Sequence, residues 1–310
     1  MDSVLSRERS REVSSARFLR IAVLAVLSLF VVVTTGAVVR LTASGLGCDN
    51  WPRCGSTPFP EKGGHAFIEF GNRVIAFSSI VVTLIAWLAS RRVSVLPPWV
   101  RTLALAVWLG TVAQIPLGGI TVIFDLHPLL VMTHFLLALV VLAGAVVVAL
   151  EAWLAEAGRS GPLGPRWWRR LALAGIPVCL ALVVTGAVVS ASGPHSGGKD
   201  IRRLGISIVD TVYVHVRVVA VFGIGFLIVA SWLWRHRREV PGVAALAGVL
   251  LALLVVQMIL GEVQYRSHLP WWLVLIHVSF AAAIWSTTVA LVHAVWRPAT
   301  PLVSKGFASQ

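Results

Sequence analysis

Eight long apolar runs constrain this chain more than any other feature of its sequence. An α-helix rises about 1.5 Å per residue, so about 20 apolar residues are needed to cross a bilayer core about 30 Å thick. Each run has about this length: Ile21–Val39, Phe67–Ala89, Leu103–Phe124, Leu129–Leu150, Leu171–Ser190, Ile208–Trp234, Val243–Val263 and Leu273–Val295. Only 13% of the 310 residues are charged, about half the share found in a soluble domain. The sequence therefore predicts an all-α integral membrane protein with eight transmembrane helices.

Basic residues are distributed unevenly between the two sides of the predicted membrane. With the N-terminus inside, the inner segments carry 17 Lys and Arg, whereas the outer loops carry seven. By the positive-inside rule, this asymmetry predicts a multi-pass protein of the cell membrane with both termini in the cytoplasm. The net charge of +13 then reflects topology, so we expect membrane lipids as partners and no nucleic acid.

The second half of the sequence resembles the first. QIPLGGITV (114–122) matches QMILGEVQY (257–265) at an offset of 143, and TGAVV occurs at 35–39 and again at 185–189. Because four helices per half preserve the orientation of the chain, these matches predict a parallel internal repeat that forms two tandem four-helix bundles. The predicted division of the chain is a cytoplasmic tail (1–20), an N-terminal half (21–150), a cytoplasmic linker (151–170), a C-terminal half (171–296) and a cytoplasmic tail (297–310).

Three of the nine histidines lie inside the outer part of predicted helices: His134, His215 and His277. Each lies about 10 Å below the outer end of its helix. A single histidine on an apolar helix is more often a packed core residue, but three at one depth indicate a metal site. Histidine pairs on facing helices hold haem iron in helical bundles. Zinc is the competing metal, but it needs four ligands, and no cysteine or close histidine pair lies at this depth.

The repeat makes the two halves unequal. At the offset of 143, Asn72 aligns with His215. The C-terminal half then has a complete axial pair, His215 and His277. In the N-terminal half, His134 faces Asn72 instead. Aligning Arg73 with the arginine of the sixth predicted helix needs an offset of 144, which leaves the register open by one residue. An incompletely ligated pocket suits a substrate better than a permanent cofactor.

Two charged residues stand near the outer end of the second predicted helix, in the stretch IEFGNR (68–73). Glu69 lies one turn from Asn72, on nearly the same helix face. Ionisable groups in membrane helices are costly and usually mark a functional site. Arg73 is expected to pair either with a haem propionate or with Glu69.

Several motifs of this chain together resemble those of haem A synthases. They are GAVVRLTASGLGCDNWPRC (36–54), IEFGNR (68–73), LGGITV (117–122), THFLLA (133–138), SGPHSGG (192–198) and LIHVSFA (275–281). The resemblance extends over all eight predicted helices. It implies a membrane oxidoreductase that oxidises the C8 methyl group of haem O to a formyl group through hydroxylated intermediates. Such an enzyme supplies haem A to cytochrome oxidase.

The resemblance also implies roles for individual residues. His215 and His277 would be the axial ligands of a permanent haem b, and His134 the ligand of the substrate haem O, both toward the outer face of the membrane. Glu69 matches a glutamate held to be essential for catalysis in the family. The departure is Asn72, where many members have histidine, so we expect a five-coordinate or water-assisted haem iron at the N-terminal site.

Cys48 and Cys54 enclose five residues of the first outer loop. On the oxidising side of a membrane such a pair can form a disulfide, and the resemblance implies one here. The alternative is a pair of free loop thiols. A disulfide at this place would have either a structural or a redox role.

Two other functions fit a membrane protein with intramembrane histidines. A di-haem membrane cytochrome b would transfer electrons without modifying a haem, but it would need complete ligand pairs in both halves. A haem carrier or transporter would have broken helices at the membrane midplane, whereas the polar residues here lie near the outer surface. The enzyme is therefore favoured, with haem O synthase and an electron acceptor as expected partners. The sequence gives no expectation for the oligomeric state.

Overall fold

The structure is a computed structural model that describes residues 12–48, 51–54, 59–60, 63–195, 197 and 201–304. In this part of the chain it consists of eight long α-helices and one 3₁₀-helix: α2 (Ser15–Leu41), α3 (Gly64–Ser90), α4 (Pro98–Ile123), α5 (Pro128–Ala157), α6 (Arg166–Ser192), α7 (Ile208–Arg235), α8 (Pro241–Arg266), α9 (Trp271–Trp296) and η1 (Thr300–Leu302). Each predicted apolar run coincides with one of the α-helices. All eight are long and apolar enough to cross a membrane. The prediction of an all-α, eight-helix membrane protein is confirmed.

The helices extend beyond the apolar runs because their ends are set by capping and proline residues. Helix α2 begins after Ser14, whose side-chain oxygen accepts a hydrogen bond from the backbone N–H of Arg17 (3.4 Å). Helices α4, α5 and α8 begin with proline in their first turn, where its fixed φ suits a helix start. Between α5 and α6 the connection is only 158–165, shorter than the predicted linker 151–170.

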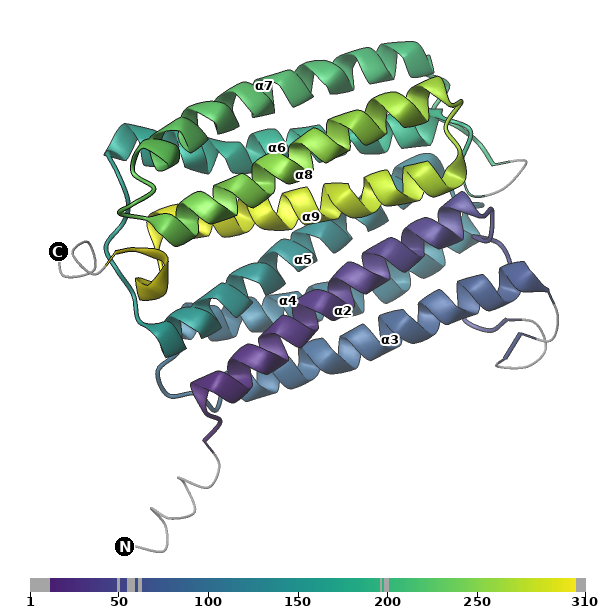
Figure 1. Cartoon of the computed structure of the whole chain (residues 1–310). Helices are drawn as coiled ribbons and strands as arrows, with labels where there is room; N and C mark the ends of the chain where they lie inside the picture. The colour runs from purple at the N-terminus through teal and green to yellow at the C-terminus, as the bar shows by residue number, and fades with distance from the viewer. Residues whose placement is uncertain are drawn as a thin grey trace, which may run out of the picture.

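The helices form two groups that meet along α5 and α9 (Figure 1). In the first group α2 packs against α3 and α5, and α4 packs against α5. The second group has the same pattern, with α6 against α7 and α9, and α8 against α9. Between the groups, the buried Trp285 donates its indole N–H to the backbone carbonyl of Leu139 (2.8 Å). The order of the helices thus agrees with two tandem four-helix bundles.

Local geometry also recurs at the offset of 143. Asp125 and Leu126 have positive φ between α4 and α5, and His268 and Leu269 have positive φ between α8 and α9. Non-glycine residues seldom adopt this conformation, so two such pairs at equivalent places indicate the same turn. The repeat over the whole of the two halves stays a prediction.

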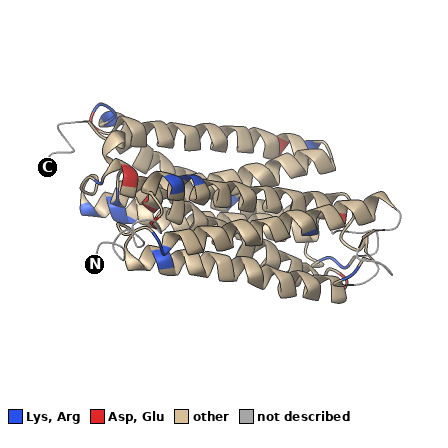
Figure 2. Ribbon diagram, turned by 90° about the horizontal axis from the view of Figure 1, so that it is seen from below, with Lys and Arg blue, Asp and Glu red and all other residues tan. Residues whose placement is uncertain are grey.

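One end of the molecule carries the start of α2, the end of α9 and most of the described basic residues (Figure 2). At this end the segment after α5 pairs with the segment after α9, through Ser160 N–H to the Pro298 carbonyl (2.9 Å) and Thr300 N–H to the Gly158 carbonyl (3.1 Å). The two groups of helices are therefore joined at this end as well as along α5 and α9. That this end faces the cytoplasm stays a prediction.

Candidate functional site

His215 lies on α7 and His277 on α9. Nδ1 of His215 shares a hydrogen bond with the hydroxyl of Thr185 on α6 (3.0 Å). This contact fixes the imidazole and leaves Nε2 available to a ligand. The backbone carbonyl of His277 accepts a hydrogen bond from Nε2 of Gln257 (3.0 Å), which fixes α9 against α8. Each histidine of the predicted C-terminal pair is therefore held by a neighbouring helix, and their role as a ligand pair stays a prediction.

Each of the three histidine rings lies against a glycine of a neighbouring helix. A Cβ atom at Gly186 would lie 3.1 Å from Cε1 of His215, and one at Gly261 would lie 3.4 Å from Cε1 of His277. In the N-terminal half, a Cβ atom at Gly118 would lie 3.4 Å from Cε1 of His134. The helices can approach the rings this closely because glycine has no side chain.

The N-terminal half repeats this arrangement around His134. Nε2 of Gln114 donates to the backbone carbonyl of His134 (3.3 Å), as Gln257 does to His277. Gln114 and Gln257 were not predicted as site residues, but their shared offset of 143 could have identified the pair. Both histidines therefore lie in the same backbone setting.

The two positions predicted to face His134 and His277 carry different residues, Asn72 and His215. The hydroxyl of Thr35 on α2 donates to Oδ1 of Asn72 on α3 (2.8 Å), just as Thr185 contacts His215. Thr35 and Thr185 are the first residues of the two TGAVV segments. This shared contact favours the register that aligns Asn72 with His215. Sequence reasoning did not identify either threonine as part of the site.

The shorter asparagine leaves space in the N-terminal half. A Cβ atom at Gly36 would meet no atom within 4 Å, whereas one at the corresponding Gly186 would meet the ring of His215. Gly36 and Gly186 each follow the threonine that holds Asn72 or His215. The volume that an imidazole fills in one half is therefore open in the other.

The described residues fit a haem better than a zinc ion. Nδ1 of His134 and Nδ1 of His277 are buried and have no hydrogen-bond partner. Buried polar atoms nearly always have one, so these nitrogens point to a ligand from outside the chain, and imidazole nitrogen is a common haem ligand. Within the described ranges no group of three or more His, Cys, Asp or Glu side chains converges, as a zinc site would require.

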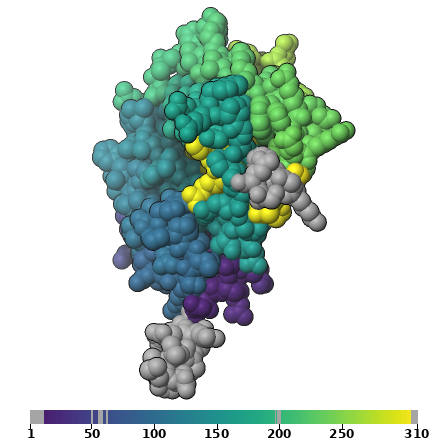
Figure 3. All heavy atoms as spheres, turned by 90° about the vertical axis from the view of Figure 1, so that its left-hand side faces the viewer, coloured from purple at the N-terminus to yellow at the C-terminus, as the bar shows by residue number. Residues whose placement is uncertain are grey.

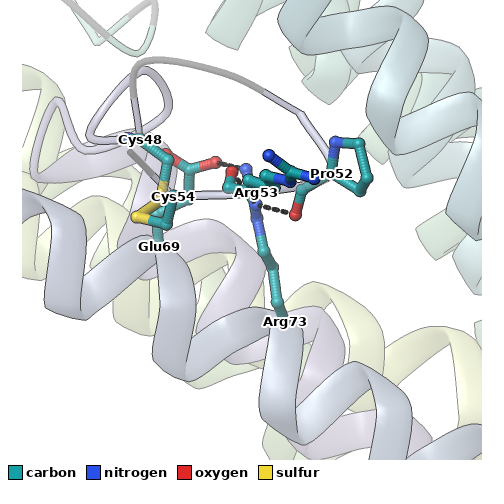
Figure 4. The surroundings of a disulfide bond; sticks show 6 residues. All are labelled: Cys48, Pro52, Arg53, Cys54, Glu69 and Arg73. Atoms are coloured by element: carbon teal, nitrogen blue, oxygen red, sulfur yellow. Dashed lines mark hydrogen bonds and ion pairs between the residues drawn. A yellow bond between two sulfur atoms is a disulfide. The ribbon is translucent and has the colours of Figure 1, made fainter. Parts of the chain in front are cut away.

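Glu69 and Arg73 hold the first outer loop against α3 (Figure 4). The Glu69 carboxylate is buried, with 6% of its side chain exposed, and it accepts a hydrogen bond from the backbone N–H of Cys48 (2.8 Å). Its other oxygen pairs with Arg73 (2.5 Å). Arg73 also donates to the backbone carbonyls of Pro52 and Arg53 (3.0 Å each). Of the two roles expected for Arg73, the structure shows the ion pair with Glu69.

The predicted disulfide between Cys48 and Cys54 is formed, so the alternative of two free thiols is wrong. Both cysteines are buried. The loop that they close places the indole of Trp51 on α4, where a Cβ atom at Gly119 would lie 2.7 Å from the ring. Gly119 adjoins Gly118, which contacts His134. The loop therefore covers the end of α4 beside His134, which sequence reasoning did not predict. Residues 49–50 of this loop lie outside the described residues.

Arg40, in the last turn of α2, joins the two groups of helices at this same end. It donates to the backbone carbonyls of Ser190 (2.9 Å) and His195 (3.0 Å). Nε2 of His195 in turn contacts the backbone carbonyl of Leu269, in the turn between α8 and α9 (2.6 Å). The C-terminal ends of α2 and α6 and the turn after α8 are therefore tied together.

Comparison with known proteins identifies relatives along most of the chain. The model of a family described as cytochrome oxidase assembly protein, COX15-CtaA, matches residues 19–289. The heme A synthase of Bacillus pumilus is 30% identical over 142 residues, 45% of this chain and 46% of the relative. That of Halalkalibacterium halodurans is 28% identical over 170 residues, 53% and 56% of the two chains. The protoheme IX farnesyltransferase of Thermus thermophilus is 29% identical over 286 residues, 83% of this chain and 45% of the relative. The chain thus spans about half the length of the curated relatives that it matches.

Proposed function

Because this chain belongs to the COX15-CtaA family of cytochrome oxidase assembly proteins, we propose that it is a haem A synthase of the cell membrane. It oxidises the C8 methyl group of haem O to a formyl group through hydroxylated intermediates. The observation that carries this proposal is the difference between the halves: Thr185 contacts a histidine, whereas Thr35 contacts Asn72. Two cofactor sites of the same kind would not need this difference.

In this proposal, the C-terminal half holds a permanent haem b between His215 and His277. A haem with two axial histidines has no open coordination position, so it would transfer electrons rather than bind a substrate. Thr185 orients His215 through its Nδ1 atom, and Gly186 and Gly261 let the neighbouring helices close around both rings. Each of these contacts restricts the motion of a ligand.

The N-terminal half binds the substrate haem O through His134. Asn72, held by Thr35, would face this histidine without adding a second strong ligand, and the free space beside Gly36 supports this. A substrate that must enter and leave is bound by one strong ligand rather than two. The Trp51 loop covers the site from the outside and restricts the access of water to the reacting methyl group.

Glu69 has two roles in this proposal. Its contacts with Arg73 and with the Cys48 N–H hold the loop closed over the substrate. Its buried carboxylate, near the start of α3, also accepts a proton that leaves when the methyl group is oxidised. Oxidation of a methyl group to a formyl group removes four electrons, so the reaction needs an external electron acceptor, and a haem b held by His215 and His277 would supply the route to it.

The partner that supplies haem O is a farnesyltransferase of the membrane. Support comes from the Thermus relative, which is named protoheme IX farnesyltransferase and is aligned with this chain over only 45% of its length. We infer that the two activities work side by side, with both termini of this chain in the cytoplasm and the haem sites near the outer face.

The test is to extract and separate the haems from membranes of cells that make haem O, with and without this chain. We expect haem A only when the chain is present. If the purified chain carries haem b but forms neither haem A nor a hydroxylated product, a di-haem cytochrome b replaces the enzyme. His277→Ala serves as a control, since it leaves the N-terminal half intact.

A further inference from the structure

A groove opens between α5 and α8, at the end of the molecule that carries both termini. It has a volume of about 350 Å³. Its floor is α9, and its walls are apolar side chains of α5 and α8; the residues that matter here are Trp153, Ala245, Ala290, His293 and Arg297. Helices α5 and α8 make no extensive direct contact in the described part of the chain; α9 and η1 each pack against both of them and connect the two walls.

One end of the groove is basic. Glu151 is buried beside it, with its carboxylate between Arg159 (3.1 Å), His293 (2.8 Å) and Arg297 (2.7 Å). Two arginines against one carboxylate leave an excess of positive charge, even with His293 neutral. The side chains of Arg159 and Arg297 are 46% and 32% exposed, so both can contact a further anion.

The rest of the groove is apolar and lies in a membrane-spanning part of the fold. Small residues of both helices line it: Ala245 and Gly242 of α8, and Ala290 and Ala294 of α9. Figure 3, which looks onto this end, shows the yellow C-terminal part of the chain lying between teal and green segments. Apolar surface of this kind is costly to leave in contact with water, and a lipid chain is the apolar group most abundant around it.

We propose that this groove binds an anionic phospholipid of the leaflet next to the termini. Its acyl chain lies along α9 between α5 and α8, and its phosphate contacts Arg159 and Arg297. Basic pockets between transmembrane helices on the cytoplasmic side commonly bind such headgroups. A bound lipid adds a contact between α5 of the first half and α8 of the second, which α9 and η1 otherwise connect. The proposal is independent of the haem chemistry.

The experiment uses the full chain purified in a mild detergent and native mass spectrometry with phosphatidylglycerol or phosphatidylcholine. We expect one phosphatidylglycerol to be retained and phosphatidylcholine to be lost at least tenfold more readily. Arg159→Gln should weaken the retention of phosphatidylglycerol at least fivefold. The variant should still fold, because Glu151 keeps Arg297 and His293 as partners. Arg170→Gln is the matched control, because it removes the same charge from an exposed position at the same end.

A second measurement locates the lipid without any variant. Phosphatidylglycerol with a photoactivatable acyl chain should label residues 150–154, 242–249 and 290–297. Ala245→Phe, which fills the groove from an exposed position of α8, should abolish this labelling. The proposal is overturned if the two lipids are retained equally. It is also overturned if Arg159→Gln and Arg170→Gln lose phosphatidylglycerol equally, or if the labelling is confined to other helices.

Discussion

Asn72→His tests whether the two halves differ through this one side chain. Thr35 is positioned to hold the new imidazole as Thr185 holds His215. Space for the ring is present, since a Cβ atom at Gly36 would meet no atom within 4 Å. We therefore expect the variant to fold and to complete a second axial pair with His134.

The expected magnitude follows from counting ligands. With both sites loaded, the protein has one complete histidine pair, so about half of its haem should be six-coordinate and low-spin. In Asn72→His, about all of the bound haem should be six-coordinate and low-spin. Carbon monoxide binding by the reduced protein should fall from about one equivalent per chain to near zero, because a second histidine occupies the open position. Haem A production should fall as well, since the product is then held by two ligands.

The assay is absorption and paramagnetic resonance spectroscopy of protein loaded with haem O, followed by carbon monoxide titration. Asn72→Ala is the control, because it removes the amide without supplying a ligand and should bind carbon monoxide as the unaltered protein does. If Asn72→His binds carbon monoxide like Asn72→Ala, residue 72 does not face the iron, and the alignment with His215 is refuted.

Three further predictions concern the same two sites. His277→Ala should remove the low-spin b-type spectrum; an unchanged spectrum would show that another residue is the ligand. Glu69→Gln should keep haem b but form no haem A, and it should destabilise the closed loop by about 1–3 kcal/mol, as expected when a buried partner of Arg73 loses its charge; haem extraction and thermal unfolding measure these effects, and normal haem A production would contradict the role of Glu69. Gly119→Ala should displace the Trp51 indole, which lies 2.7 Å from the added Cβ atom, and should speed reduction of the loop disulfide. Gly36→Ala, which meets nothing within 4 Å, is its control, and equal reduction rates would exclude the close packing of Trp51.

The parts of the fold that the sequence predicts are those that depend on local composition. A bilayer of fixed thickness selects apolar runs of one length, so all eight helices are evident without a structure. The ends of the helices are less evident, because the length of an apolar run corresponds to the thickness of the hydrocarbon core rather than to the length of the helix. Helix α2, for example, begins at Ser15, several residues before the apolar run that starts at Ile21. Its cap, Ser14, is one of the residue types that favour this position.

The parts of the site that the sequence does not predict depend on contacts between distant segments. The sequence alone identifies Arg40 only as one of the seven basic residues of the predicted outer loops. In the structure it donates to the backbone carbonyls of Ser190 and His195, about 150 residues away. Because every residue has a backbone carbonyl, the sequence does not show which carbonyl a distant side chain will contact. The position of Trp51 was also missed, because the path of a short disulfide loop is set by what lies beneath it. Glycine at position 119 allows that path, but a helical glycine alone does not indicate which group will pack on it.

The C-terminal ends of α4 and α8 differ at the position where Trp51 packs on α4. The residue 143 positions after Gly119 is Glu262, which is exposed and pairs with Arg266. An aromatic ring cannot lie on α8 there as Trp51 lies on α4, because the position carries a charged side chain instead of a hydrogen atom. A haem held permanently by two histidines needs no cover that can open. A substrate held by His134 alone needs both an opening for exchange and a cover that excludes water during the reaction. In the proposed enzyme Asn72 and Gly119 therefore belong together: one would leave the iron position open, and the other would let the loop close over it.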